Sequence, residues 1–180
     1  PVIFFEHRWL YWSEQKVKEE SFEIEIGKGK IVKKGEDLTI IAISWMNVEA
    51  ILAAEILKKR NISIEIIDPR TLYPLDKKMI VNSVRKTKKC LVVDCDWTFG
   101  GMSGEIASIV SKECFKVLQK PVERLGFKHI PCPTARHLEN SFYPNAENIV
   151  RKAEKLLDLS AMNLDGIEFF SNEKKFKGPL

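Results

Sequence analysis

The sequence predicts an α/β fold, specifically a three-layer α/β/α sandwich built on a mostly parallel sheet. Two observations carry this prediction. Short runs of β-branched and other apolar residues alternate with longer stretches of helical periodicity, which is the pattern of parallel strands joined by right-handed crossovers. The run LTIIAIS at 38–44 is almost continuously apolar, as expected for a central strand that is covered on both faces.

The expected strands are short, rich in Ile, Val and Leu, and bounded by turn residues. They are expected at 31–32, 38–44, 62–67, 90–94 and 122–127, the last as an edge strand. Asp68 and Pro69 end the strand at 62–67, because proline removes a ladder donor and fixes φ.

The stretches between these strands carry apolar stripes at helical spacing. Helices are expected at 47–59, 76–86, 103–118 and 145–157. Asp76 is a good N-cap for the second helix, since its carboxylate can accept hydrogen bonds from the free amides of the first turn.

The chain divides into four segments. Residues 27–158 carry the alternating strands and helices and are expected to form one domain, whereas 13–26 read as a solvated linker rich in Lys and Glu. The opening run PVIFF predicts a buried strand with no preceding helix to cover it, so we expect 1–12 to finish a truncated preceding domain. Periodicity is lost from Ser160 onward, and 159–180 are expected to be a tail that packs on the surface or is mobile.

The composition is that of an ordinary globular protein. The chain has 180 residues, of which 44% are hydrophobic and 30% charged, and its net charge of +4 comes from lysines interleaved with glutamates. This pattern argues against a nucleic-acid or membrane-surface partner, and no apolar run reaches the ~18 residues of a membrane span. The four cysteines lack the spacing of a metal site or disulfide framework, which predicts free buried thiols in a reducing compartment, cytoplasm or organelle matrix.

Chemistry-bearing motifs are few. The glycine-rich loop at 98–104 leads into a helix N-terminus and could hold an anion, but it lacks the lysine of a P-loop, and a tight turn explains it as well. Asp94 and Asp96 are either a carboxylate pair or helix-cap and loop acceptors. The sequence contains no complete active site and no metal site. The loop at 68–76 does place Arg70 after a parallel strand, on the side of a sheet where ligands bind.

Several blocks of the sequence together resemble one enzyme family. The blocks are PVIFFEH, LTIIAIS, IEIIDPRTLYPLD, GGMSGEI, PVERLG and PNAENIV, in this order between residue 1 and about 157. They are similar to the C-terminal part of the beta subunit of 2-oxoacid dehydrogenase first components, such as those for pyruvate or branched-chain 2-oxoacids. Transketolase and deoxyxylulose-phosphate synthase are more distant relatives, and IEIIDPRTLYPLD is typical of the transketolase C-terminal domain.

The resemblance implies a function. Enzymes of this family use thiamine diphosphate and Mg²⁺ to decarboxylate a 2-oxoacid and transfer the acyl group to lipoyl. Residues 1–12 would then be the last strand of the pyrimidine-binding domain, and 27–158 the transketolase C-terminal-like domain. The implied partners are an alpha subunit or domain, a second beta subunit in a homodimeric contact, and the dihydrolipoyl acyltransferase. The cofactor-binding motifs belong to other domains of the family, so no cofactor is expected in this chain by itself.

The resemblance also implies roles for single residues. Arg70 matches the arginine of an R-x-x-x-P-L-D arrangement that holds a substrate anion in deoxyxylulose-phosphate synthases, which implies a place in the substrate channel. The alternative is a structural salt bridge with Asp68, Asp76 or a neighbouring subunit. Residues expected at a subunit interface are charged or aromatic: Glu6, His7, Arg8, Trp9, Tyr11 and Tyr73. For the aromatic patch at 9–12, packing on the body of the same chain is the alternative.

Two departures from the family leave other functions open. Ser44-Trp45-Met46 replaces a turn that usually contains glycine, and Asp94 stands where the family often has Glu. A related thiamine enzyme acting on sugar phosphates and a non-catalytic binding module are the alternatives, and the 2-oxoacid itself is not specified by these residues.

Overall fold

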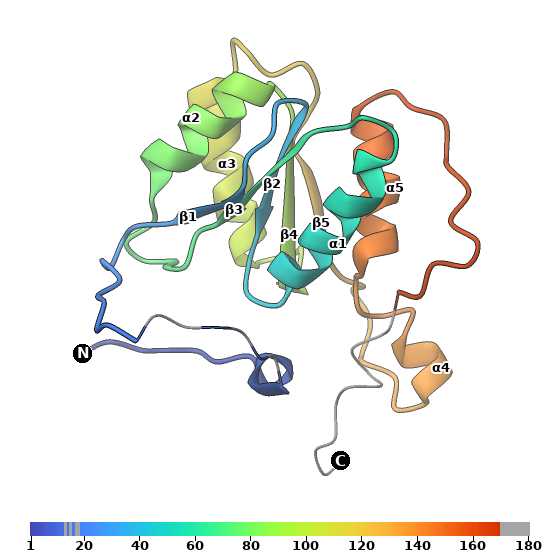
Figure 1. Ribbon diagram of the computed structural model, residues 1–180, viewed down its shortest axis with the longest axis horizontal. Helices are drawn as coiled ribbons and strands as arrows, with labels where there is room; N and C mark the ends of the chain where they lie inside the picture. The colour runs from blue at the N-terminus through green and yellow to red at the C-terminus, as the bar shows by residue number, and fades with distance from the viewer. Residues whose placement is uncertain (13, 15, 17–18, 170–180) are drawn as a thin grey trace.

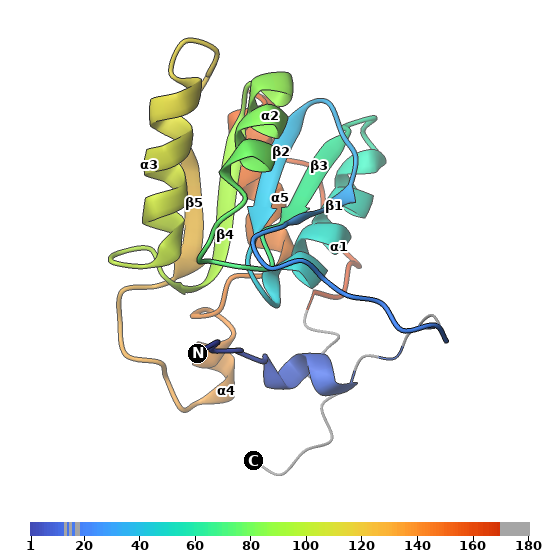
Figure 2. The same cartoon turned by 90° about the vertical axis from the view of Figure 1, so that its left-hand side faces the viewer.

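The protein is an α/β/α sandwich, as the sequence predicts. The structure, a computed structural model, describes residues 1–12, 14, 16 and 19–169. Helices α1 (Met46–Lys58) and α5 (Ala146–Leu156) cover one face of a five-stranded sheet. Helices α2 (Lys77–Thr87) and α3 (Met102–Cys114) cover the other (Figures 1 and 2).

The five predicted strands all form. They are β1 (Lys30–Lys33), β2 (Leu38–Ala42), β3 (Ile64–Asp68), β4 (Cys90–Trp97) and β5 (Glu123–Phe127). The strand order is β1-β3-β2-β4-β5, in which β1 is antiparallel to β3 and the other pairs are parallel. Strand β2 is buried along its whole length at the centre of the sheet, and β5 lies at an edge, so both predictions are confirmed.

The sheet separates two apolar cores. On β3, Ile64 and Ile66 point toward α1 and α5, while Ile67 points toward α2 and α3. Side chains alternate between the two faces of a strand, and both faces of this sheet are covered, so the strand is apolar on each side. Glu65 is the exception, because it is fully buried on the α2 face.

The helix ends follow local capping rules. The carboxylate of Asp76 accepts from the amide of Met79 at 3.1 Å, which confirms Asp76 as the N-cap of α2. Asn145 forms a capping box with Asn148 at the start of α5. Helix α3 ends at Cys114, four residues before its predicted end, and the chain continues in a turn in which the amides of Val117 and Leu118 donate to the Cys114 carbonyl.

The opening segment corrects one prediction. Pro1–Phe5 were expected to form a buried strand, but they have no strand structure, and the side chains from Val2 to Phe5 are 76–87% exposed. A strand needs a neighbouring backbone to complete its ladder, and no described segment pairs with these residues. The short 3-10 helix η1 (Arg8–Trp12) follows, at the carboxyl end of the sheet (Figure 2). The assignment of 1–12 to a pyrimidine-binding domain stays a prediction.

The two flanking segments are described in part. Residues 14, 16 and 19–26 form neither helix nor strand and are exposed, as expected of a linker, and the rest of 13–18 lies outside the described residues. The described part of the tail, 159–169, returns to the domain, where Leu164 is buried against the α1–α5 core. Residues 170–180 lie outside the described part.

The prediction of free, buried cysteines is right in that the thiols are free and partly wrong in that not all of them are buried. All four cysteines are free. Cys90 and Cys114 are buried in the α2–α3 core and Cys95 is half-buried, whereas Cys132 is exposed because it lies in the loop between β5 and the short helix α4 (Arg136–Glu139). Burial raises the pKa of the Cys95 thiol to about 12. Among the described residues, no helix combines the length and apolar character that crossing a membrane requires.

Candidate functional site

The carboxyl ends of β2, β3 and β4 open on one edge of the sheet. The loop that carries Arg70, the glycine-rich loop before α3, the helix η1 and the helix α4 lie at this edge (Figure 2). In open parallel sheets this is the edge at which ligands bind.

Arg70 is exposed and its backbone is held in an unusual conformation. Its φ is +57°, in the left-handed region, and its amide donates to Asp68 Oδ1 at 3.0 Å. The carboxylate of Asp76 accepts from the amides of Gly29 and Met79. Within the described part of the chain the Arg70 guanidinium makes no ion pair, so a salt bridge to Asp68 or Asp76 is not what holds this loop.

Tyr73 lies in the same loop and is 96% exposed. The loop is anchored on either side of it, because Thr71 Oγ1 accepts from the amide of Gly27 at 3.1 Å and Pro74 packs against Gly27. The loop thus presents Arg70 and Tyr73 outward from a fixed base.

An aromatic cluster joins the opening segment to the domain. Its members form one connected network of ring contacts, in which Trp9 joins His7 and Trp45 to Tyr143: His7, Trp9, Trp45, Tyr143, Phe142, Phe127 and Trp97. The rings of Trp9 and Trp45 meet edge-on with centroids 5.3 Å apart, and His7 stacks on Trp45 at 5.8 Å. Burial lowers the pKa of His7, so its imidazole is neutral at neutral pH. His7 and Trp9 therefore pack on the body of the same chain, which is one of the two interpretations of this patch.

The other residues expected at an interface stay exposed. Tyr11 donates to Glu6 at 2.5 Å, and both side chains face solvent, as does Arg8. Sequence reasoning missed Trp45, Phe142 and Tyr143, whose role depends on contacts between segments distant in the sequence. The subunit interface itself remains a prediction.

Trp45 follows a strained turn. Ser44 has φ +55°, a conformation that glycine adopts most readily. The family resemblance predicts a glycine-containing turn here, and the positive φ of Ser44 gives a physical reason for that prediction.

Asp94 occupies the N-terminus of α3. The nearby amides of Ser103 and Cys95 favour its ionised form, but the side chain is buried and its Oδ2 has no hydrogen-bond partner among the described residues. Gly101 permits this turn, because a Cβ there would lie 2.2 Å from the Trp97 carbonyl oxygen. The helix N-terminus thus faces a carboxyl group from the same chain, and the close approach at Gly101 supports the interpretation of the loop as a tight turn. Asp96 accepts from the amide of Trp97 and is exposed, so it is a loop acceptor, as one of the two interpretations predicted for it.

Asp94 is expected to make stability depend on pH. Burial, and then the charge of Asp96, raises the pKa of Asp94 above its ordinary 3.8, which means that folding disfavours its ionised form. The free energy of unfolding should therefore fall as pH rises from below 3.8 through the raised pKa. Asp94→Asn should flatten this slope in urea titrations between pH 3 and 7, while Asp96→Asn, at an exposed site, should flatten it less. Equal slopes in the wild type and Asp94→Asn would contradict the assignment.

The cofactor that the family resemblance implies is thiamine diphosphate with Mg²⁺. A diphosphate site requires an Mg²⁺ ion held by oxygen ligands. No group of three or more His, Cys, Asp or Glu residues that could hold a metal ion occurs among the described residues. The described residues therefore do not fit a resident cofactor site, and the prediction that the chain by itself holds no cofactor stays a prediction.

These features define a class of protein: a mostly parallel α/β domain, with an antiparallel edge strand, that presents loops at the carboxyl edge of its sheet. The chain belongs to the transketolase C-terminal domain family, whose sequence profile matches residues 27–149. This confirms the family resemblance seen in the sequence.

Individual relatives support this family assignment. The chain is 38% identical over 156 residues to the pyruvate dehydrogenase E1 component subunit beta of Rickettsia bellii, a match that covers 87% of this chain and 48% of the relative. It is 42% identical over 159 residues to the mitochondrial pyruvate dehydrogenase E1 component subunit beta of Pisum sativum, covering 86% of this chain and 44% of the relative. A solved split-gene transketolase, an inactive beta4 tetramer, superposes with a TM-score of 0.67 at 25% identity, covering 81% of this chain and 47% of that one. The chain spans about half the length of the curated relatives it matches.

Proposed function

We propose that this chain acts as the C-terminal part of the beta subunit of a 2-oxoacid dehydrogenase, which decarboxylates pyruvate or a related 2-oxoacid and transfers the acyl group to lipoyl. The observation that carries the proposal is the identity of 35–42% to pyruvate dehydrogenase beta subunits along 86–87% of the chain. Thiamine diphosphate with Mg²⁺, bound by other parts of the complete enzyme, would supply the electron sink that decarboxylation of a 2-oxoacid requires.

Within this enzyme we assign Arg70 to the substrate channel. Its guanidinium is exposed at the carboxyl edge of the sheet and makes no ion pair with another described residue. A guanidinium binds a carboxylate through two parallel hydrogen bonds, which a lysine ammonium does not reproduce. Arg70 would orient the carboxylate of the incoming 2-oxoacid, and the anchored loop would keep the guanidinium in place.

The proposed partners are an alpha subunit or domain, a second beta subunit and the dihydrolipoyl acyltransferase. Exposed apolar side chains from Val2 to Phe5, and the exposed Glu6, Arg8, Tyr11 and Tyr73, are the surfaces proposed for subunit contacts. The beta4 assembly of the related split-gene transketolase supports contacts between beta chains.

The test is reductive acylation of a lipoyl domain by the complete enzyme that contains this chain. With pyruvate or a branched-chain 2-oxoacid, Arg70→Lys should lower kcat/KM by about 5- to 150-fold, which corresponds to about 1–3 kcal/mol of lost transition-state binding. Arg85→Lys, at an exposed arginine on α2, is the matched control and should leave kcat/KM unchanged.

Three outcomes would redirect the proposal. Loss of assembly or a lower melting temperature in Arg70→Lys, with normal kinetics in the remaining active sites, would make Arg70 a structural residue. Turnover of ketose phosphates without any 2-oxoacid activity would favour the transketolase-type alternative. Absence of both activities in the complete protein would favour a non-catalytic module.

A further inference from the structure

A groove of about 600 Å³ lies between β1 and α2. The two elements run along it in the same direction. At one end, the amide of Gly29, just before β1, donates to Asp76 Oδ2 at the start of α2. At the other end, the amide of Gly35, shortly after β1, donates to Glu65, whose carboxylate also contacts Lys86 in the last turn of α2. The groove therefore extends along most of α2.

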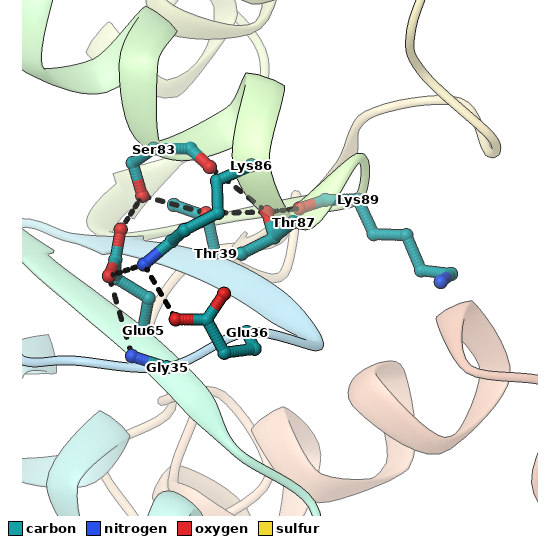
Figure 3. A network of polar contacts seen from close by, with 8 residues as sticks. All are labelled: Gly35, Glu36, Thr39, Glu65, Ser83, Lys86, Thr87 and Lys89. Atoms are coloured by element: carbon teal, nitrogen blue, oxygen red, sulfur yellow. Dashed lines mark hydrogen bonds and ion pairs between the residues drawn. The ribbon is translucent and has the colours of Figure 1, made fainter.

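A buried polar network closes the second end of the groove (Figure 3). Glu65 lies in β3, lines the groove and is 1% exposed. Ser83 on α2 donates to Glu65 Oε1, and Lys86 Nζ lies 2.5 Å from Oε2. The hydroxyl of Thr39 on β2 lies 2.9 Å from that of Ser83, and Glu36 lies 3.4 Å from Lys86 Nζ. The positive charge of Lys86 is thus already matched by carboxylates of the same chain.

Three other lysines of the lining have no such partner. Lys28 and Lys34 flank β1, and Lys78 lies in the first turn of α2; none of them makes an ion pair within the described part of the chain. The remaining acidic residue of the lining, Asp76, accepts from two backbone amides at 3.3 and 3.1 Å. The lining thus has four lysines against two carboxylates, and unpaired lysines lie at both ends of the groove.

Between its two ends the groove is apolar. Ile31 on β1 and Met79 on α2 supply this part of the lining, and Ile31 is 41% exposed, so part of its apolar surface is uncovered. On α2 the two ends are marked by Lys78 and Lys86, which are eight residues and therefore about 12 Å apart along the helix. The described residues that line the groove include no aromatic side chain on which a nucleotide base could stack. This pattern favours an acidic protein segment over a nucleic acid.

We propose that the groove binds an extended acidic segment of a partner protein, with acidic residues at positions i and i+4 and an apolar residue at i+2. In an extended chain these three side chains point to the same side, so all of them can enter the groove, and i to i+4 spans about 13 Å. The acidic side chains would pair with Lys28 and Lys78 at one end and with Lys34 at the other. The apolar side chain would cover Ile31 and Met79. This binding would be independent of catalysis.

Fluorescence anisotropy with the full chain tests the binding. The probe is a labelled peptide with the core Glu-Thr-Leu-Thr-Glu. The matched control peptide, Glu-Leu-Thr-Thr-Glu, has the same composition but turns its leucine to the opposite side, and it should bind about five-fold more weakly because the leucine stays in water.

Charge reversal in the groove gives the second arm of the test. A groove variant combines Lys28→Glu, Lys34→Glu and Lys78→Glu, and it should raise the Kd of the acidic probe by about ten-fold or more, because like charges then face each other. A peptide with the core Lys-Thr-Leu-Thr-Lys should bind this variant more tightly than it binds the wild type, because the charges are again complementary.

The controls separate this contact from a general charge effect. Lys59→Glu, Lys112→Glu and Lys116→Glu together change the net charge by the same amount at exposed lysines elsewhere and should leave the Kd of the acidic probe unchanged. Circular dichroism should show that every variant remains folded. A wild-type chain that does not bind the probe, equal binding of the two acidic peptides, or a groove variant that binds the probe as the wild type does would each overturn the proposal. So would an oligothymidylate that competes as strongly as the unlabelled probe, since the groove would then be a general polyanion surface.

Discussion

Replacing Trp45 with alanine is expected to lower the free energy of unfolding by about 3–5 kcal/mol and to release the opening segment. Trp45 is only 4% exposed, and its ring contacts both His7 and Trp9. Its truncation would leave a cavity beside the α1–α5 core and remove the surface on which the opening segment packs. Urea titration measures the first effect, and limited proteolysis at Arg8 measures the second.

Trp9→Ala is the matched control for this prediction. Trp9 is half-buried and belongs to the opening segment, so its truncation should release that segment with a smaller loss of stability. If Trp45→Ala loses stability while Arg8 stays protected from protease, other contacts hold the opening segment. That result would contradict the role of the aromatic cluster in anchoring it.

Lys86→Met is expected to cost about 2–3 kcal/mol of stability, because it leaves the Glu65 carboxylate buried without its cation. The loss should lie below that of a fully buried pair, since the Lys86 side chain is 37% exposed and therefore partly screened by solvent. The hydrogen bond with Glu65 raises the pKa of Lys86 above its ordinary 10.5. The stabilisation is thus fully present at neutral pH and is lost only as pH rises through this raised pKa.

The double variant Glu65→Leu/Lys86→Met isolates the pair. It should recover most of the stability lost in Lys86→Met, because no charge is then left buried and the apolar pair can pack on β3. Urea titrations of the wild type, both single variants and the double variant form the cycle. A double variant as unstable as Lys86→Met would show that the network holds Glu65 without help from Lys86.

Local patterns determined the layers and most element boundaries of this protein. The apolar runs, the helical stripes and the N-cap Asp76 each act within a few residues, so the strands β2 to β5 and the helix α2 could be predicted closely. The same patterns, read as a family resemblance, led to the transketolase C-terminal domain and to Arg70 as a candidate site residue.

Tertiary structure alone decided which side chains meet. Pro1–Phe5 has the composition of a strand, yet it has no paired neighbour among the described residues and stays exposed. Trp45 contacts the opening segment, and the buried Asp94 faces the N-terminus of α3, through contacts that no local spacing encodes. Glu65 is a charged residue in an otherwise apolar strand. Its burial is explained only by Ser83 and Lys86, which α2 places next to its carboxylate. The physical reason is that secondary-structure propensity acts between residues close in sequence. Burial and charge pairing instead depend on which side chains the folded sheet and its helices bring together.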